Sequence, residues 1–389
     1  MIWDSFGSLF AGVGQWLASA DGVRGLIMIV IGCLLLFLAV AKDFEPLLLL
    51  PIGVGCIWAN LPLSAFLGEW DSSDGHLVLR AAHGLLSALY DVGVANEVFP
   101  LLIFIGIGAM TDFGPLLENP KMIFLGGAGQ FGIFLTLLLA LALGFAPEQA
   151  ASIGVIGAID GPTSIYVSAR LSPDLLGPIT VAAYSYMALV PIIMPPVMRL
   201  LTTPAQRAIK MAYSSRTISR TVRIVFPVAV TIVVGLLVPF ALPLVGSLML
   251  GNLMRESGVV ERLARAAQNE LANVVTLCLG LAIGSTMVGA NFLNLKTLAI
   301  LGLGLFAFVA DTAVGVLMGH FYRIVTRGKF NPLIGAAGIS AFPMAARVVQ
   351  REAAKADYGN FILMHAMGAN AAGQIASAMA GGVLLALLA

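Results

Sequence analysis

Long apolar runs separated by short polar stretches dominate the chain. The first run covers about residues 25–41, and a second, about 46–67, contains prolines, glycines and an asparagine that predict a bent or re-entrant segment. Further runs cover about residues 98–110, 122–146, 150–169, 175–201, 224–254, 273–292, 297–319, 331–345 and 361–389. A helix needs about 20 apolar residues to cross a bilayer. The pattern therefore predicts an all-α polytopic membrane protein with roughly ten to twelve membrane segments.

Some stretches do not fit a plain spanning helix. The runs 98–110 and 331–345 are too short to cross, so we interpret them as half-helices or re-entrant hairpins. Residues 69–94 are polar and predict an extramembrane loop or short helix. Residues 1–24 are mixed, with no basic start and no small-residue cleavage site, which favours an interfacial helix over a signal peptide.

Composition supports the membrane assignment. Of 389 residues, 59% are hydrophobic and 11% are charged, against about 25% charged in soluble domains. The mean hydropathy is +0.97. These values exclude a soluble enzyme, a disordered chain and a collagen-like chain, and a net charge of +1 argues against a nucleic-acid partner. Three cysteines without a CxxC pair support neither a disulfide framework nor a zinc site.

A basic stretch lies near the middle of the chain. Six arginines or lysines occur from Arg199 to Arg223, and no acidic residue occurs from 175 to 255. The positive-inside rule makes residues 201–223 a cytoplasmic linker. We interpret it as a topological signal between a first membrane half, 25–200, and a second, 224–389.

Asp160 is an acid in the middle of an apolar run. A carboxylate at the bilayer centre costs about 2.5 to 3.5 kcal/mol on the lenient scale, so such a residue indicates function. The Gly161-Pro162 pair directly after it breaks the helix and frees backbone carbonyls, and Thr163 and Ser164 add hydroxyls. This set of oxygens is typical of a hard-cation site. The alternative is a kinked helix whose aspartate pairs with a neighbouring arginine or lysine.

A second broken segment, residues 331–343, lies about half the chain away. It contains Asn331, Ser340 and two glycines, with a proline near each end. Two discontinuous helices at matching places in two halves are the signature of an inverted-repeat transporter with a midplane site. Asn370 adds an amide in the last run. For Asp311, a second intramembrane acid, a structural and a functional role both stay open.

Other polar or motif-like features carry less. The GxGxxG pattern at 127–132 opens no βαβ unit, and close helix packing explains it better than dinucleotide binding. The four histidines have no metal-ligand spacing. Tyr184 and Tyr186 lie in an apolar helix, where their hydroxyls need partners.

Residue chemistry alone thus predicts a cation-coupled membrane protein, with sodium favoured. It leaves open a sodium symporter or exchanger, an energy-coupled pump, and a membrane anchor whose polar residues are structural. Six motifs carry a resemblance to one family: 44–53 (FEPLLLLPIG), 105–120 (IGIGAMTDFGPLLENP), 160–163 (DGPT), 331–338 (NPLIGAAG), 340–349 (SAFPMAARVV) and 364–374 (MHAMGANAAGQ). From about residue 25 onward the chain resembles the β subunit of the bacterial sodium-pumping, biotin-dependent decarboxylases.

The resemblance implies an activity and partners. It implies a carboxybiotin decarboxylase subunit that exports sodium in the bacterial inner membrane. A soluble, biotin-bearing carboxyltransferase α subunit would load CO2 onto biotin and supply carboxybiotin in trans, and a small membrane γ subunit and a homo-oligomeric β core are implied too. Oxaloacetate is favoured as the source of the CO2 only because that enzyme is common.

The resemblance also implies roles for single residues. Asp160 corresponds to a sodium ligand that exchanges protons, and Tyr186 to a tyrosine in sodium binding and proton delivery. A second sodium-binding set comprises Asn331, Gly335, Ser340 and Asn370. Arg347 corresponds to an arginine near the carboxybiotin entrance, with a catalytic and cofactor-binding role. One departure is Met194, which stands where the family usually has glutamine.

Overall fold

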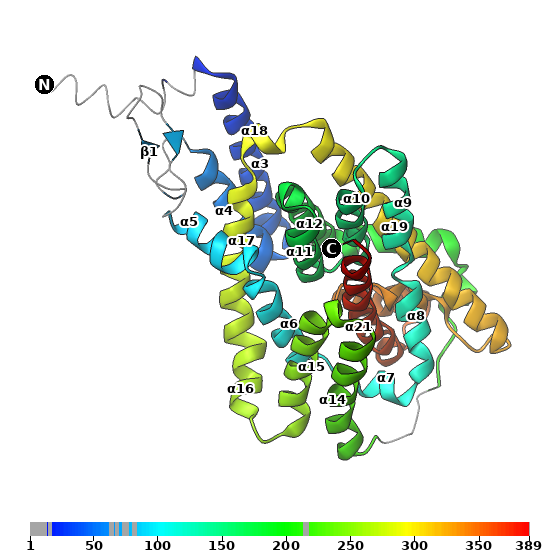
Figure 1. Ribbon diagram of the computed structural model, residues 1–389. Helices are drawn as coiled ribbons and strands as arrows, with labels where there is room; N and C mark the ends of the chain where they lie inside the picture. The colour runs from blue at the N-terminus through cyan, green and yellow to red at the C-terminus, as the bar shows by residue number, and fades with distance from the viewer. Residues whose placement is uncertain are drawn as a thin grey trace, which may run out of the picture. The chain divides into compact units, whose positions relative to one another are not determined.

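The computed structural model describes residues 18–61, 84–212 and 218–388, together with positions 14, 66, 70–71 and 78–79. Within these residues the chain is helical (Figure 1), apart from one antiparallel pair of two-residue strands, β1 (Trp70–Asp71) and β2 (Val78–Leu79). The all-α expectation is therefore confirmed, since the strand pair is confined to a connection between helices.

Close packing groups the chain into two compact units. The first comprises Met1–Phe99 and Asn273–Ile300, and the second comprises Pro100–Ala272 and Leu301–Ala389. This grouping does not follow a division at residues 201–223. It reflects packing, whereas the two halves are defined by an inverted repeat, which stays a prediction.

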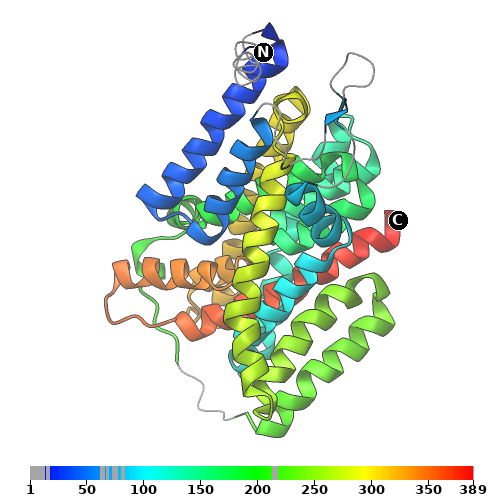
Figure 2. The ribbon, with the colours of Figure 1, turned by 90° about the vertical axis from the view of Figure 1, so that its left-hand side faces the viewer.

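Helices α3 and α4 dominate the first unit and lie side by side (Figure 2). The elements of this unit are α3 (Ala20–Lys42), α4 (Pro46–Asn60), α5 (Leu85–Leu89), the π-helical turn η1 (Tyr90–Ala95), α17 (Ala272–Thr286) and α18 (Gly289–Phe292). Gly32 and Gly53 let the two helices approach closely, because a Cβ on either glycine would lie 2.9 Å from the carbonyl oxygen of the other. At the end of α4, the Asn60 amide donates to the Met287 carbonyl at 2.7 Å and ties α4 to the chain after α17.

The second unit holds most of the chain. Its elements up to the linker are α6 (Val98–Met110), α7 (Gly114–Glu118), η2 (Pro120–Met122), α8 (Ile123–Ala128), α9 (Phe131–Ala142), α10 (Pro147–Gly154), η3 (Val155–Ala158), α11 (Gly161–Leu171), η4 (Pro173–Leu175), α12 (Leu176–Leu201) and α13 (Pro204–Arg207). After the linker come α14 (Arg220–Leu237), η5 (Pro239–Ala241), α15 (Leu242–Ser257), α16 (Glu261–Ala266), the π-helical η6 (Ala267–Leu271), α19 (Leu295–Val325), η7 (Pro332–Gly338), α20 (Met344–Ala356) and α21 (Leu363–Leu388). Of the α19 residues, those from Leu301 onward belong to this unit.

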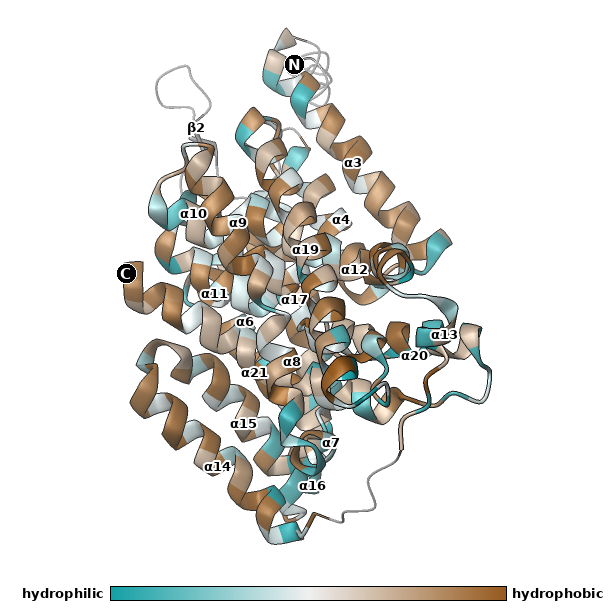
Figure 3. Cartoon of the chain, turned by 90° about the vertical axis from the view of Figure 1, so that its right-hand side faces the viewer, coloured by the Kyte–Doolittle hydropathy of each residue, from teal (hydrophilic) through white to brown (hydrophobic). Residues whose placement is uncertain are grey.

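Seven helical stretches among the described residues are long and apolar enough to cross a membrane, and an eighth span is possible if one bent pair counts. In α14, only 11% of the apolar window is buried, and Figure 3 shows hydrophobic colouring along it, as expected for a helix that faces lipid. A polytopic membrane protein is thus confirmed, but the predicted count of ten to twelve segments is not.

Several boundaries differ from the sequence-based expectation. Helix α3 begins at Ala20 rather than near residue 25, because the Ser19 hydroxyl accepts a hydrogen bond from Gly22 N–H and caps the helix there. Residues 69–94 were expected to form an extramembrane loop or short helix, and Leu85–Ala95 is helical; together with Val98–Met110 it forms a bent pair, with a bend of 63°, that is apolar enough to count as one span. Of the predicted interfacial helix at 1–24, residues 1–13 and 15–17 lie outside the described part of the chain.

Candidate functional site

Two broken segments meet at the centre of the second unit. The first is η3, one 3-10 turn that leads to Asp160 and α11, and the second is η7, which leads to Ser340. They are joined directly, because the Ser340 N–H donates to the Ala158 carbonyl at 3.1 Å. The broken runs predicted around Asp160 and at 331–343 are both confirmed.

Ile159 marks the turn between η3 and Asp160. It is fully buried and adopts φ 53° and ψ 44°, the left-handed region that β-branched residues avoid. Such a conformation costs about 1–3 kcal/mol and persists only where the surroundings hold it. The turn therefore presents Asp160 in a fixed direction at the expense of local stability.

Asp160 caps helix α11 and receives hydroxyl donors. Its Oδ2 accepts hydrogen bonds of 2.7 Å from both the Thr163 hydroxyl and the Ser377 hydroxyl, and its Oδ1 accepts a longer one, 3.4 Å, from the Thr163 N–H. The side chain is 3% exposed, and no salt bridge to it occurs among the described residues. The alternative of an aspartate paired with a neighbouring arginine or lysine is therefore wrong.

Helix α21 carries polar groups to both broken segments. Asn370 donates to the Ile339 carbonyl at 2.7 Å, and Gln374 donates to the Ser340 carbonyl. Ser377 reaches Asp160. The spacing of these three residues places them on one helical face. Ser340 completes the contact, since its hydroxyl donates to the Gly373 carbonyl at 2.9 Å.

Several buried oxygens around this contact have no partner among the described residues. They are Asn370 Oδ1, Gln374 Oε1, Gln130 Oε1 and the Tyr184 hydroxyl. A buried polar atom without a partner needs an explanation, and one explanation is an ion or water that it can ligate. Together with Asp160 these oxygens suit a small hard cation, because sodium-like ions prefer carboxylate, amide and hydroxyl oxygens.

Glycines permit the close packing at this centre. A Cβ on Gly129 would lie 2.5 Å from the Gly338 carbonyl oxygen, and one on Gly132 would meet the backbone of Ala307. This confirms close packing as the reason for two glycines of the GxGxxG pattern. Gly335 behaves alike, since its Cβ would lie 1.9 Å from the Gly315 carbonyl oxygen.

Asn331 lies at the opposite end of η7. Its amide donates to the carbonyls of Arg207 and Ile209, at 2.9 and 2.8 Å, and its Oδ1 accepts from the Leu333 N–H. Segment η7 has seven residues, and a 3-10 helix rises about 2 Å per residue, so the segment places about 14 Å between Asn331 and Ser340. The structure therefore brings Ser340 and Asn370 to the Asp160 centre, whereas Asn331 lies away from it and is hydrogen-bonded to the linker.

The two tyrosines of α12 occupy different positions. The Tyr186 hydroxyl donates to the Leu301 carbonyl on α19. Tyr184 lies over the turn, because a Cβ on Gly161 would be 2.3 Å from its ring. Tyr184 is therefore the tyrosine next to Asp160. Tyr186 is two residues further along α12, which puts it on another side of the helix, toward α19. Arg347 is exposed on α20, and its guanidinium makes no hydrogen bond or ion pair with the described residues.

Sequence reasoning left three neighbours of this centre out of the site: Tyr184, Gln374 and Ser377. A signal for the two on α21 was present, since Asn370, Gln374 and Ser377 follow helical spacing. No local pattern joins Ser377 to Asp160, because 217 positions separate them.

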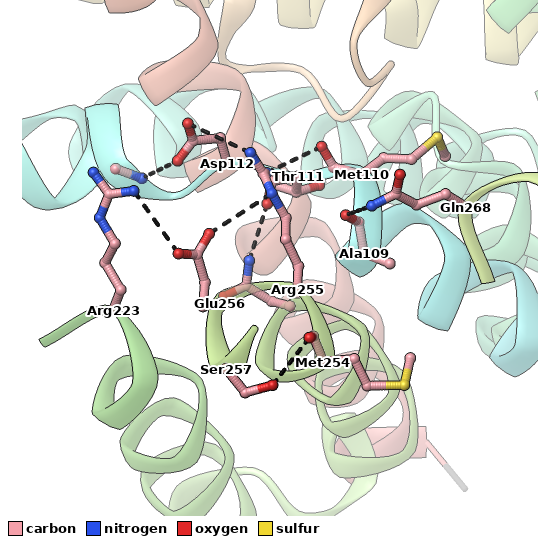
Figure 4. Close-up of polar contacts among 12 residues, drawn as sticks. Ala109, Met110, Thr111, Asp112, Arg223, Met254, Arg255, Glu256, Ser257 and Gln268 are labelled. Carbon is pink, nitrogen blue, oxygen red and sulfur yellow. Dashed lines mark hydrogen bonds and ion pairs between the residues drawn. The ribbon is translucent and has the colours of Figure 1, made fainter. Parts of the chain in front are cut away.

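A charged network lies at the ends of α6, α14 and α15 (Figure 4). Arg255 points toward both Asp112 and Glu256, with nitrogen–oxygen distances of 3.6 and 3.7 Å, and Arg223 approaches Glu256 at 3.8 Å. Asn252 donates to the Thr111 carbonyl at 2.9 Å. The 105–120 motif therefore fixes the end of α6 to the two helices that follow the linker.

A second ion pair holds α12 to α20. Arg199 donates two hydrogen bonds, of 2.7 and 2.9 Å, to the Glu352 carboxylate. Lys355 adds a third at 2.6 Å. Burial raises the pKa of Glu352, but the hydrogen bonds from Arg199 and Lys355 outweigh burial and hold that pKa below its ordinary value.

Comparisons with known proteins identify the family of the chain. The family described as "Na+-transporting oxaloacetate decarboxylase beta subunit" matches residues 24–388. The β subunit of methylmalonyl-CoA decarboxylase from Veillonella parvula is 52% identical, over 93% of this chain and 92% of that protein. The glutaconyl-CoA decarboxylase β subunit of Acidaminococcus fermentans is 51% identical over 93% and 92%. The oxaloacetate decarboxylase β chain of Klebsiella pneumoniae is 46% identical over 98% of each. With its apolar spans, its two broken segments and these relatives, the chain belongs to the family of integral-membrane β subunits of sodium-transporting decarboxylases.

Proposed function

We propose that this chain decarboxylates carboxybiotin, supplied in trans by a partner subunit, and couples that reaction to sodium export and proton consumption. The observation that carries the proposal is the meeting of Asp160, Ser340 and three α21 side chains at the crossing of two broken segments. A chain that only anchored a soluble complex would have no need of unpartnered buried oxygens there.

Asp160 would couple the two ions. Carboxybiotin loses CO2 readily once its ureido nitrogen is protonated, so the protein has to supply a proton and a dry pocket. Sodium that binds beside Asp160 displaces the carboxyl proton, and renewed protonation releases sodium on the other side. One carboxyl group can thus hold either ion but not both.

The remaining residues have supporting roles in this proposal. Asn370, Ser340 and Gln374 would supply neutral oxygens to sodium, as would backbone carbonyls near Gly335. Tyr184, beside the turn, and Tyr186 would pass a proton onward, since a phenol can donate and accept. Arg347, exposed and cationic, would attract the carboxylate of carboxybiotin at the entrance.

The proposal includes partners and an architecture. A biotin-bearing carboxyltransferase α subunit and a small membrane γ subunit would complete the complex, with β as a homo-oligomer. The two halves, 25–200 and 224–389, would be inverted repeats that give alternating access around the crossing. The β subunit meets only carboxybiotin, so oxaloacetate, methylmalonyl-CoA and glutaconyl-CoA all stay candidates for loading the biotin.

A sodium-coupled secondary transporter is the second candidate. The same oxygens at two broken segments would serve a symporter or exchanger. Such a protein would need no biotin-bearing partner. Copurification of the chain with a polypeptide that avidin detects separates the two, because only the decarboxylase requires it.

The test measures CO2 release from carboxybiotin against sodium concentration at three pH values, on β with its biotinylated partner. If proton and sodium share Asp160, each unit by which the pH is lowered should reduce the apparent sodium affinity by up to tenfold, over the pH range in which the carboxyl is protonated. The apparent sodium affinity should stop changing with pH where the carboxyl is already ionised. Potassium should not replace sodium in supporting CO2 release. A sodium affinity that does not change with pH contradicts the shared site.

A further inference from the structure

One face of helix α19 contacts both broken segments. Near its start, Gly304 lies against the ring of Tyr186 and the side chain of Ile156 in η3, where a Cβ would be 2.7 and 2.9 Å away. Two further glycines, Gly315 and Gly319, lie against the backbone of Gly335 and Pro332 at the start of η7. These small residues make α19 a common support for the segments that carry Asp160 and Ser340.

Asp311 lies on this face between the two contact regions. Its side chain is fully buried. Oδ1 accepts a hydrogen bond from the Gly132 N–H at the start of α9, and Oδ2 has no partner among the described residues. That second oxygen faces the first broken segment, because a Cβ added to Gly157 would lie 3.0 Å from it. Gly157 is three residues before Asp160.

The surroundings of Asp311 suit a proton rather than a cation. On the α9 side the carboxyl meets one backbone N–H at the start of a helix, which cannot ligate a cation, and the atom left for a proton is the buried Oδ2, which has no partner among the described residues. No salt bridge to Asp311 occurs among the described residues. The elements packed on this face contribute three ionisable groups: Asp160, after η3, and Tyr184 and Tyr186, from α12. Among the described residues, Gly132 is the one hydrogen-bond donor to the Asp311 side chain.

We propose that Asp311 is a second proton-binding site of the transport unit, controlled by whether the Asp160-bearing segment is seated on α19. As the segment seats on α19 the carboxyl takes up a proton from water at Oδ2 before it is sealed, because an unpaired charge in the sealed site is unfavourable. When the segment leaves α19, water reaches the carboxyl and the O–H proton returns to water. Asp311 acts through Gly157 and is a positioning residue, with no contact to sodium.

The inference rests on the proposed function in one respect, since a transport cycle must move the segment. It is tested on the complete complex in lipid by sodium-induced difference infrared spectroscopy of carboxyl C=O stretching. We expect a protonated-carboxyl band that changes when sodium is added and is absent from Asp311→Asn. Thr312→Val is the matched control, because Thr312 is equally buried on the same helix and bonds only to the Phe308 carbonyl.

Asp311→Asn keeps the acceptor for Gly132, so the variant is expected to fold. Its maximal rate at saturating sodium should fall by about tenfold or more and lose one ionisation from the pH profile. Its sodium half-saturation should shift from wild type by the amount that linkage to the Asp311 proton requires, while the pH dependence that comes from Asp160 remains. That pattern separates the inference from the proposed function, which predicts pH-dependent sodium affinity through Asp160.

Two results would overturn the inference. The first is a set of infrared bands that Asp311→Asn leaves unchanged, because the carboxyl would then be ionised throughout. The second is a band that is present but insensitive to sodium, because the acid would then be a fixed structural group. If Asp311→Asn does not fold, Asp311→Glu serves instead: it keeps an ionisable carboxyl, so its sodium-sensitive band must shift from the wild-type frequency, and an unshifted set of bands contradicts the proposal.

Discussion

The two ends of segment η7 offer a direct comparison between identical side chains. Asn331 and Asn370 are both fully buried, both donate their amide N–H groups to backbone carbonyls, and both contact this segment or the turn after it. Their oxygens differ. Asn331 Oδ1 accepts from Leu333 N–H, whereas Asn370 Oδ1 has no partner among the described residues.

The difference separates a structural amide from a candidate ligand. Every polar atom of Asn331 is engaged within the chain, and its bonds fix residues 207 and 209 of the linker. Asn370 Oδ1 accepts no hydrogen bond from the described residues, so it is the candidate ligand for a cation. A resemblance that assigns both residues to sodium therefore covers two unlike environments, and experiment can separate them.

The largest expected effect is that of Asp160→Asn. Asparagine caps helices as well as aspartate, so α11 should form normally. The amide cannot exchange a proton, so we expect loss of both sodium transport and carboxybiotin decarboxylation in a protein that still inserts and folds. Transport and CO2 release in proteoliposomes measure this, and substantial sodium-coupled turnover would remove the proton-exchange role.

Substitutions at the crossing come next. Asn370→Ala and Ser340→Ala each remove one neutral oxygen, which should weaken sodium binding by about 1 to 3 kcal/mol. The sodium concentration for half-maximal rate should then rise roughly 5- to 150-fold. The maximal rate should suffer less than in Asp160→Asn. If both variants need the same sodium concentration as wild type for half-maximal rate, these residues have only a packing role.

Asn331→Ala is the matched contrast to Asn370→Ala. It removes the hydrogen bonds from Asn331 to the Arg207 and Ile209 carbonyls, but Asn360 also donates to both, so the protein should be destabilised by only about 1 kcal/mol. Sodium half-saturation should stay within about twofold of wild type. Melting temperature in detergent and sodium titration measure the two effects. A sodium shift as large as that of Asn370→Ala would make Asn331 a ligand and end the contrast.

The smallest effect concerns the ion pair between Arg199 and Glu352. Glu352→Gln should lower stability at pH 7 by about 1 kcal/mol, since Arg199 is partly exposed. The pKa of Glu352 is lowered in the fold, so the stabilisation is complete above its ordinary value of 4.5 and is lost as the pH falls through the folded pKa. Melting curves of both proteins should therefore converge below about pH 4.5. If the melting temperatures of wild type and Glu352→Gln still differ at acidic pH, the charge of the carboxylate is not the cause of the difference.

The sequence by itself determined the class of protein and the positions of its irregular segments. Apolar runs with few charges require a lipid-facing surface, and helix breakers beside Asp160 and after Asn331 require backbone that is not regular helix. Both are local properties, readable within a few residues. The number of spans was less accessible, because bends such as that between residues 95 and 98 depend on neighbouring helices.

Only the tertiary structure decided which of these residues meet. Ser340 reaches Ala158, and Ser377 reaches Asp160 across 217 positions, through contacts that no periodicity encodes. The same packing directs Asn331 to the linker and leaves the Asn370 oxygen unpartnered. A side chain's chemistry is fixed by its type, but whether its atoms are already satisfied depends on neighbours distant in the chain, which the fold alone brings together.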